Sequence, residues 1–563
     1  MKKQIKQLVF GAIKELGINP QADELSRITI ERPEPELADY STNAALILAK
    51  TAGKKPRELA EAIASKIASG SIGKTEVAGP GFINFRLSDE RLLRSVREIA
   101  ARGIGKPKVA GEKILVEYFQ PNIAKPMHIG LLRTTIIGDA LKRMLMFLGN
   151  TVESDTHMGD WGTQFGLLLL AYKKYGDGAV IEKDPVNELN KIYVKINQEA
   201  EADSAVREAG KAEFAKLEQG DKDNRAIWQK FVDMSMEKFL LINEWMDILA
   251  FEHHWPESYY ENLMPAIVEK LQSLNLLKES QGAKIVDLEN QSLGVAVVIK
   301  SDGSTTYLLR DLATFVYRKS LGFSRQLYVV DSRQSHAFRQ LFAILKLMGE
   351  MKDEEGVHVD YGFISFEGSA LSTRKGNMVL VEDVLRQAQE KAAAVIEEKN
   401  PELKNKQEVV KAVAIGALKY FDLSHNRHSD IDFDWNTALS FDGNSGPYLQ
   451  YTYARLKSIL RKAGDEAASQ APDAELDPAG RQVLVLLENF ADTVEESLSG
   501  YMPNLFANYL YELSEALNKF YHSSPVLTAE GDLKKLRLSI VAAGANALAE
   551  GLKLLGITPL EEM

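Results

Sequence analysis

The stretch that decides the fold is Glu117-Tyr118-Phe119-Gln120-Pro121-Asn122-Ile123-Ala124-Lys125-Pro126-Met127-His128-Ile129-Gly130-Leu131. It follows a short apolar run that ends at Glu117, and it precedes an apolar run with helical spacing from 132 to 147. This pattern predicts a buried strand, a tight turn and the first turn of a helix. In a parallel α/β sheet an anion binds at such a junction, because free backbone N–H groups and the helix dipole favour a phosphate.

Length and composition indicate a large multidomain protein. The chain has 563 residues, which is too many for one core, with 45% hydrophobic and 26% charged residues. Three or four domains of a soluble globular protein are therefore expected. We find no run of about 18 apolar residues and no secretory signal at the N-terminus, so we expect no membrane association.

Charge and cysteine content limit the class of partner and site. Cysteine is absent, which excludes disulfides, thiolate zinc sites and a cysteine nucleophile, and is compatible with the cytoplasmic location that we expect. The net charge is −11, so any RNA partner must be held by local basic patches against an unfavourable overall field.

The order of the segments predicts an α/β multidomain protein. Residues 1–105 resemble a small α/β domain, and residues 106–400 a parallel-sheet domain that contains a helical insertion at about 184–285. Residues 401–440 are expected to form a connecting stem, and residues 441–563 an all-helical domain. The apolar runs 294–299 and 326–330 are both predicted to continue the parallel sheet.

The junction itself contains the residue types that a nucleotide site needs. His128 at a helix start can donate to a phosphate oxygen, Gly130 lets a flat base approach the backbone, and Lys125 adds a positive charge. The alternative is a hydrogen-bonded structural histidine at an ordinary helix start.

A second phosphate contact is predicted at Ser369-Ala370-Leu371-Ser372-Thr373-Arg374-Lys375-Gly376-Asn377. This polar loop combines hydroxyls and cations with a flexible glycine. The alternative is a surface turn. No GxxxxGK[ST] sequence exists, so a P-loop is not supported.

A separate set of residues suits a cationic side chain. Glu117 stands at a strand end, Tyr307 and Asp311 lie four residues apart on one predicted helical face, and Gln334 follows another strand. The alternatives are a salt bridge of Asp311 with Arg310 or Arg318, and a core position for Tyr307.

Three further features of the sequence suggest a structural or binding role. His157-Met158-Gly159-Asp160-Trp161-Gly162-Thr163-Gln164-Phe165-Gly166 predicts a turn under the nucleotide, with a structural role for Trp161. The segment 443–455 enters a predicted helix with a basic end, and its Tyr448, Tyr451 and Arg455 could stack on bases and meet phosphates, or belong to a core stripe. The pairs His253/His254 and His425/His428 lack cysteine partners, so we expect no protein-ligated metal.

Taken together, these motifs resemble the arginyl-tRNA synthetase family, bacterial type, among the class I aminoacyl-tRNA synthetases. The junction resembles the HIGH box, with Leu131 in place of the second histidine. The loop at 369–377 resembles a variant KMSKS loop, with Ala370 and Thr373 where lysines would stand. The resemblance implies a Rossmann-like catalytic domain, an N-terminal domain that touches the tRNA elbow, and a helical anticodon-binding domain.

The resemblance also implies the function and the role of each residue. It implies an arginine–tRNA ligase whose partners are ATP with Mg²⁺, L-arginine and tRNA(Arg). It also implies that the enzyme is a monomer and activates arginine only when tRNA is bound. Catalysis would fall to His128 and Lys125. The implied ATP-binding residues are Pro121, His128, Gly130, Leu131, Ser372, Thr373, Arg374 and Lys375, and the implied arginine-binding residues are Glu117, Asn122, Tyr307, Asp311 and Gln334.

Two other functions stay open at this point. The first is a catalytically silent paralogue that binds tRNA or arginine, which is motivated by Leu131 and the lysine-poor loop. The second is a nucleotidyltransferase for a smaller substrate on the same fold, against which the helical C-terminal third argues.

Overall fold

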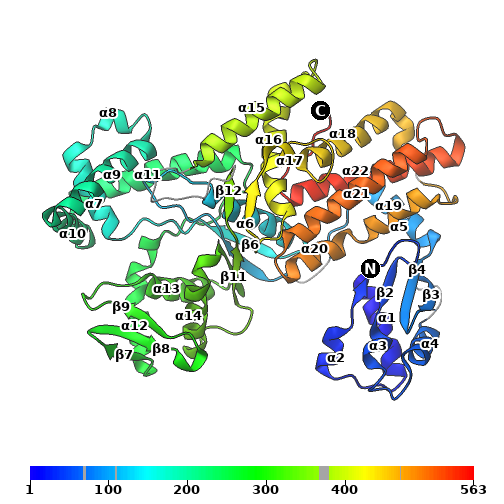
Figure 1. Ribbon diagram of the computed structural model, residues 1–563, viewed down its shortest axis with the longest axis horizontal. Helices are drawn as coiled ribbons and strands as arrows, with labels where there is room; N and C mark the ends of the chain where they lie inside the picture. The colour runs from blue at the N-terminus through cyan, green and yellow to red at the C-terminus, as the bar shows by residue number, and fades with distance from the viewer. Residues whose placement is uncertain (68–71, 108–110, 367–378, 469–470) are drawn as a thin grey trace. The chain divides into compact units, whose positions relative to one another are not determined.

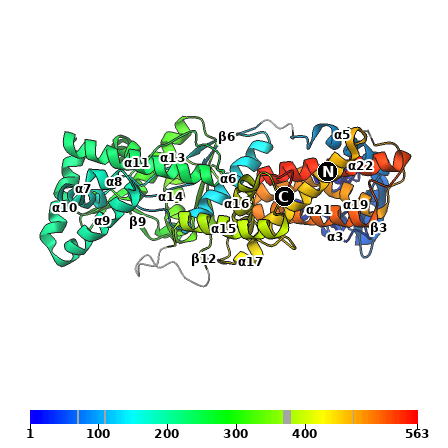
Figure 2. The same ribbon diagram turned by 90° about the horizontal axis from the view of Figure 1, so that it is seen from above.

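The computed structural model describes residues 1–67, 72–107, 111–366, 379–468 and 471–563. The chain forms two compact units. Unit 1 comprises Met1–Pro107, Phe441–Lys553 and Thr558–Met563, and unit 2 comprises Lys108–Ser440 and Leu554–Ile557 (Figures 1 and 2). The boundaries predicted at 105, 400 and 440 stay predictions.

Unit 2 contains the parallel sheet that the sequence predicts. Its strands are β5 (Lys113–Glu117), β6 (Thr151–Asp155), β10 (Arg325–Asp331) and β11 (Gly356–Tyr361), in the order β11-β10-β5-β6, and every neighbouring pair is parallel. In the register, Glu117 lies opposite Tyr328 on one side and Asp155 on the other. The last residue of β5 is therefore in the middle of the carboxyl edge of the sheet.

Helix α6 (Gly130–Phe147) follows β5 and belongs to the core. Most of its residues are buried, including the polar residues Arg133 and Asp139, so solvent meets little of its surface. A helix that is largely apolar on all sides is stable only in such a buried position. Its start, at Gly130, faces the carboxyl edge of the sheet as expected.

One strand prediction is wrong. The run near 294–299 forms β9 (Val295–Ile299), but this strand pairs antiparallel with β8 (Ala283–Asp287) in a separate three-stranded sheet that also contains β7 (Leu277–Ser280). Gln281 and Gly282 have φ values of 49° and 78°, which suit a two-residue hairpin turn between β7 and β8. Without a helical crossover before β9, no parallel pairing is available to it.

A series of helices lies between β6 and β7, and it begins before the insertion that the sequence predicts at about 184–285. Its elements are α7 (Thr163–Tyr175), α8 (Gly178–Ile181), α9 (Pro185–Ala202), α10 (Ser204–Glu218), α11 (Lys222–Trp245), the 3₁₀ helix η1 (Glu257–Leu263) and α12 (Met264–Ser273). Helices α7, α9, α10 and α11 lie together at one end of unit 2 in both views (Figures 1 and 2).

The remaining elements of unit 2 follow in the second half of the chain. They are η2 (Glu289–Gln291), α13 (Tyr307–Ser320), η3 (Ser332–Gln334), α14 (Ser335–Leu347), β12 (Ile364–Phe366), α15 (Val381–Lys399), α16 (Lys406–Ser424), β13 (Ile431–Phe433) and α17 (Trp435–Ala438). Helix α15 ends just before Pro401, because proline disfavours helical backbone at the preceding residue.

The N-terminal part of unit 1 is an α/β domain. Its antiparallel sheet has the order β1 (Ile30–Glu31), β2 (Tyr40–Thr42), β4 (Phe82–Leu87) and β3 (Gly73–Ala78). Its helices are α1 (Lys2–Glu15), α2 (Ala22–Arg27), α3 (Ala44–Leu48), α4 (Pro56–Lys66) and α5 (Asp89–Arg102). Ile5, Val9 and Ile13 are buried at helical spacing along α1, as the sequence predicts.

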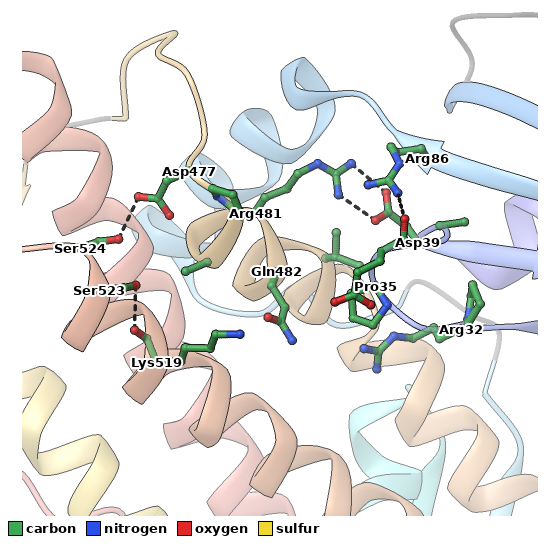
Figure 3. A pocket seen from close by; sticks show the side chains of 16 residues that line it. Arg32, Pro35, Asp39, Arg86, Asp477, Arg481, Gln482, Lys519, Ser523 and Ser524 are labelled. Carbon is green, nitrogen blue, oxygen red and sulfur yellow. Dashed lines mark hydrogen bonds and ion pairs between the residues drawn. The ribbon is translucent and has the colours of Figure 1, made fainter.

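The C-terminal part of unit 1 is helical throughout the described residues. Its elements are α18 (Gly446–Ala463), η4 (Gly464–Ala468), α19 (Pro478–Glu488), α20 (Phe490–Ser499), α21 (Pro503–Ser523) and α22 (Gly531–Leu554). Arg481 of α19 donates to both carboxylate oxygens of Asp39 at 2.7 and 2.9 Å, beside a cavity of about 580 Å³ (Figure 3). Across the described ranges, no helix is both long enough and apolar enough to cross a membrane.

Candidate active site

A cavity of about 620 Å³ opens at the carboxyl edge of the parallel sheet in unit 2. This volume is within the range of small-molecule sites. The polar and charged residues that line it are Glu117, Gln120, Asn122, His128, His157, Glu257, Tyr307, Asp311, Asp331, Arg333, Gln334, Gln340 and Tyr361. Gly130 and Leu131 of the α6 start also line it, so one cavity contains residues from both predicted halves of the site.

The predicted acidic residues meet in this cavity. Glu117 ends β5 with 5% of its surface exposed, and Asp311 lies one helical turn after Tyr307 on α13. Tyr307 is 66% exposed, so it is not a core ring. The alternative for Asp311, a salt bridge with Arg310 or Arg318, does not form. Arg310 pairs with Glu257 and Glu261, and Arg318 pairs with Glu117 and Asp155.

Four carboxylates line the cavity, and three of them have an arginine partner. Glu117 accepts from Arg318 at 2.5 Å, Glu257 from Arg310 at 3.0 Å, and Asp331 from Arg333 at 2.9 Å. Among the residues that the structure describes, no side chain donates a hydrogen bond to Asp311. Within the described part of the chain, Asp311 is therefore the one lining carboxylate without a charged hydrogen-bond partner.

Burial controls the ionisation of these acids. Burial and the nearby Glu117 raise the pKa of Asp311 to about 7. Burial raises the pKa of Glu257 to about 8, against the pull of Arg310. Burial also acts to raise the pKa of Glu117, but the charges of His157 and Arg318 outweigh it and the pKa is lowered. Glu117 is therefore ionised at neutral pH.

His128 and Gly130 form the start of α6. The backbone N–H of Gly130 donates to Nδ1 of His128 at 3.1 Å, which leaves the proton of a neutral ring on Nε2. Burial, followed by the charge of Arg333, lowers the pKa of His128, so the ring is a neutral donor. A Cβ at Gly130 would approach the His128 ring to 2.9 Å, so a larger residue would displace that ring.

The motif at 157–166 is explained by its pairing with the turn after β5. Gly159 donates to the carbonyl of Pro121 at 3.0 Å and accepts from the N–H of Ile123 at 3.1 Å. A Cβ at Gly159 would lie 2.3 Å from Oδ1 of Asn122, so only glycine permits this approach. Trp161 is 4% exposed, as expected for a structural residue.

The backbone around the cavity is strained at three positions. Phe119, Ala124 and His157 have φ values of 85°, 58° and 36°, in the region that non-glycine residues rarely adopt. Such strain persists only where surrounding contacts fix it, and it gathers at functional sites. The N–H of Ala124 donates to the hydroxyl of Ser235 at 2.9 Å, which holds one of these positions.

Some predicted residues lie elsewhere. Lys125 does not line the main cavity. Its Nζ donates to Gln164 at 3.4 Å and lies 5.2 Å from the ring centre of Tyr193. Pro121 is buried beside Gly159. The predicted phosphate residues Ser372, Thr373, Arg374 and Lys375 are outside the described residues.

The predicted tRNA-binding residues on α18 have mixed surroundings. Tyr448 accepts a hydrogen bond from Asn518 at 2.9 Å, and Arg455 lies 4.3 Å from the ring centre of Tyr521. Tyr451 is 44% exposed and is the more accessible ring of the two tyrosines. Base stacking at these positions stays a prediction.

The four histidines that could suggest a metal have protein partners. His253 pairs with Glu153 at 2.6 Å, and His254 lies 3.4 Å from the hydroxyl of Thr156. His425 contacts the carbonyl of Phe421 at 2.6 Å and His428 pairs with Asp360 at 3.2 Å.

Several residues of the cavity were not predicted from the sequence, among them His157, Arg333 and Glu257. His157 begins the motif at 157–166, which predicts a turn under the nucleotide but no side-chain contact in the cavity. Arg333 is adjacent to the predicted Gln334, so its position in the sequence was a usable signal. Glu257 had no such signal, because it lies within the predicted insertion and reaches the cavity only through tertiary packing.

Comparisons with known proteins cover the whole chain. The description "tRNA synthetases class I (R), catalytic domain" matches residues 98–435, "DALR anticodon binding domain" matches 449–563, and "Arginyl tRNA synthetase N terminal domain" matches 3–87. The arginine–tRNA ligase of Halothermothrix orenii is 39% identical over 100% of this chain and 99% of its own length. That of Lactococcus lactis subsp. cremoris is 41% identical over 99% of this chain and 100% of its own.

A solved structure is similar over the same extent. The Thermus thermophilus arginyl-tRNA synthetase superposes with a TM-score of 0.87 at 28% identity, and the match covers 100% of both chains. The matched families, the relatives and the order of the motifs agree, and this chain belongs to the arginyl-tRNA synthetase family.

Proposed function

We propose that this protein activates L-arginine with ATP to arginyl-adenylate and then transfers the arginyl group to the 3′ end of tRNA(Arg). The observation that carries the proposal is the unpaired Asp311 in a cavity that also contains the start of α6. A single unpaired carboxylate matches a singly charged guanidinium, and a helix start matches a phosphate.

Arginine would bind at the acidic end of the cavity. Its guanidinium has five donors and needs fixed acceptors, which Glu117 and Asp311 supply. Tyr307 would cover the methylene groups and lose its exposure on binding. Asn122 and Gln334 line the same cavity and would hold the α-amino and α-carboxyl groups.

ATP would bind at the α6 end. The carboxylate of arginine attacks the α-phosphorus in line and pyrophosphate leaves, so negative charge develops on the phosphoryl oxygens. The neutral His128, through Nε2–H, and the positive end of the α6 dipole would stabilise that charge. We expect Mg²⁺ to arrive with the triphosphate and to be held mainly by its oxygens. Pro121, Leu131 and the residues 372–375 stay part of the proposed ATP site, and Lys125 is proposed to assist from the neighbouring turn.

The other domains would position tRNA. The N-terminal domain would contact the tRNA elbow, and the C-terminal helices would read the anticodon, with Tyr448, Tyr451 and Arg455 as candidate contacts. A monomer that acts in the cytoplasm is the corresponding proposal for assembly and location.

The test is ATP–pyrophosphate exchange that depends on both arginine and tRNA(Arg), followed by charging of that tRNA. Exchange that requires L-arginine supports the proposal. Leu131 lines the cavity where a second histidine would stand, and this favours a silent paralogue as the competing function. Arginine binding without exchange would establish that alternative.

A further inference from the structure

The last turn of α13 carries a cation that no substrate can reach. Arg318 is 0% exposed and lies seven residues after Asp311, two turns further along the same face. It does not line the cavity, whereas Glu117 does. Arg318 therefore lies behind the acidic wall of the pocket.

Arg318 joins two carboxylates from neighbouring strands. Its Nη1 donates to Glu117 Oε2 at 2.5 Å, and its Nη2 donates to Asp155 Oδ2 at 2.5 Å. The fork of one guanidinium spans the ends of β5 and β6, which a single ammonium group cannot do with the same geometry. The position of the Glu117 carboxylate is thus fixed from behind.

Few other groups compensate the charge of Glu117. Oε1 of Glu117 accepts a hydrogen bond from the neutral Gln120 at 3.3 Å. The uncharged rings of Tyr260 and Tyr328 lie beside Arg318, with their centres 5.9 and 5.8 Å from its guanidinium carbon. His157 Nδ1 lies 3.9 Å from Glu117 and, when protonated, also lowers the pKa of that carboxyl. Burial lowers the pKa of His157 itself, so Arg318 is the cation beside Glu117 at neutral pH. Removing a buried partner of this kind leaves a carboxylate that gains a proton instead.

We propose that Arg318 is the positioning residue that gives the pocket its specificity for a singly charged side chain, because it holds Glu117 as a fixed, ionised acceptor and balances its charge. This inference rests on the proposed function. With Arg318 in place, Asp311 alone remains to pair with the charge of the substrate. Without Arg318, Glu117 is protonated and its O–H group faces the guanidinium. The guanidinium has only N–H donors, so no hydrogen bond forms from that O–H group.

The test compares arginine with citrulline, whose neutral side chain replaces one guanidinium nitrogen with a carbonyl oxygen. A protonated Glu117 can donate to that oxygen. In Arg318→Met, the KM for arginine in the ATP–pyrophosphate exchange assay should rise at least about tenfold. The inhibition constant of citrulline in the same assay should change less than about threefold. The KM for ATP should stay within about twofold of wild type, because the phosphate end does not contact Arg318.

Two further variants complete the design. Arg318→Lys retains the buried charge and is expected to fold, but its ammonium reaches one carboxylate well, so the KM for arginine should again rise about tenfold with a smaller loss of kcat. Lys319→Met is the matched control, since Lys319 is next on α13 and pairs with Glu355 at 2.9 Å away from the cavity. It should behave as wild type.

Separate outcomes test the two proposals. If wild-type protein shows no arginine-dependent exchange, the proposed function fails. If wild type is active but folded Arg318 variants keep the wild-type KM for arginine, only the role of Arg318 is refuted. An equal rise for arginine and citrulline would also refute it, because a merely structural defect weakens both alike.

Discussion

The two ends of the cavity use different physical means to bind charge. The arginine end relies on buried side chains, with Glu117 fixed by Arg318 and Asp311 left unpaired. The α6 end relies on backbone geometry, with Gly130 donating to His128 at the helix start and the uncharged Leu131 beside it. A fixed ion pair needs a precise partner, whereas a helix start accepts any phosphate of suitable position. Substitutions at the arginine end should therefore have the larger and more selective effects.

The largest effect is expected at Asp311. Asp311→Asn keeps the size of the side chain but removes the charge that faces the guanidinium, so kcat/KM for arginine should fall about 10³-fold, equivalent to about 4 kcal/mol. Exchange kinetics at varied arginine and fixed ATP measure this loss. Asp353→Asn is the control, because Asp353 is an exposed residue paired with Lys346. If Asp311→Asn lowers kcat/KM for arginine by less than about threefold, the arginine end is no more sensitive to substitution than the α6 end.

At the α6 end the expected loss is smaller and appears in turnover. His128→Ala removes one donor to the developing phosphoryl charge, so kcat should fall about 10²-fold while the KM for arginine changes little. Steady-state exchange separates these parameters. A rise in the KM for arginine with unchanged kcat would mean that His128 belongs to the arginine end.

The pH dependence of arginine binding probes the unpaired acid directly. Burial and Glu117 raise the pKa of Asp311 to about 7, so the carboxyl is mostly protonated at pH 6 and mostly ionised at pH 8. The KM for arginine should fall about tenfold from pH 6 to 8 and then level off, and this trend should vanish in Asp311→Asn. A flat profile in wild type would contradict the assignment.

The same group makes stability depend on pH with a definite sign. Its folded pKa of about 7 exceeds the ordinary value of 3.8, so the folded state holds a proton that the unfolded chain has released between these values. Asp311 therefore lowers stability as pH rises through this window, and bound arginine offsets the loss. The rise in Tm caused by arginine should be larger at pH 8 than at pH 6.

The smallest effect is expected at Leu131. Leu131→His adds a second side-chain donor beside Nε2–H of His128, so the activity should stay similar or rise by up to about tenfold. Exchange and charging assays measure it. A large loss of turnover would show that the α6 end is built around leucine and is as selective as the arginine end.

Particular elements show how far the sequence reaches. The spacing of Tyr307 and Asp311 correctly predicts one helical face, and the junction at 117–131 correctly predicts strand, turn and helix start. Both depend on local backbone geometry, which sequence spacing records. The strand at 295–299 was placed in the wrong sheet, because an apolar run carries no information about its pairing partner.

By itself, the sequence determined the parallel sheet, the helix start beside it and the acids that converge on its edge, because periodicity and glycine spacing are local properties. Only the tertiary structure decided which charges are paired. Arg318 stands 201 residues from Glu117 and 163 from Asp155 along the chain, and Arg310 reaches Glu257 across 53 residues. Asp311 has no charged hydrogen-bond partner among the described residues because these arginines pair with other acids. Such long-range pairs depend on distances in space, which a local sequence pattern does not record.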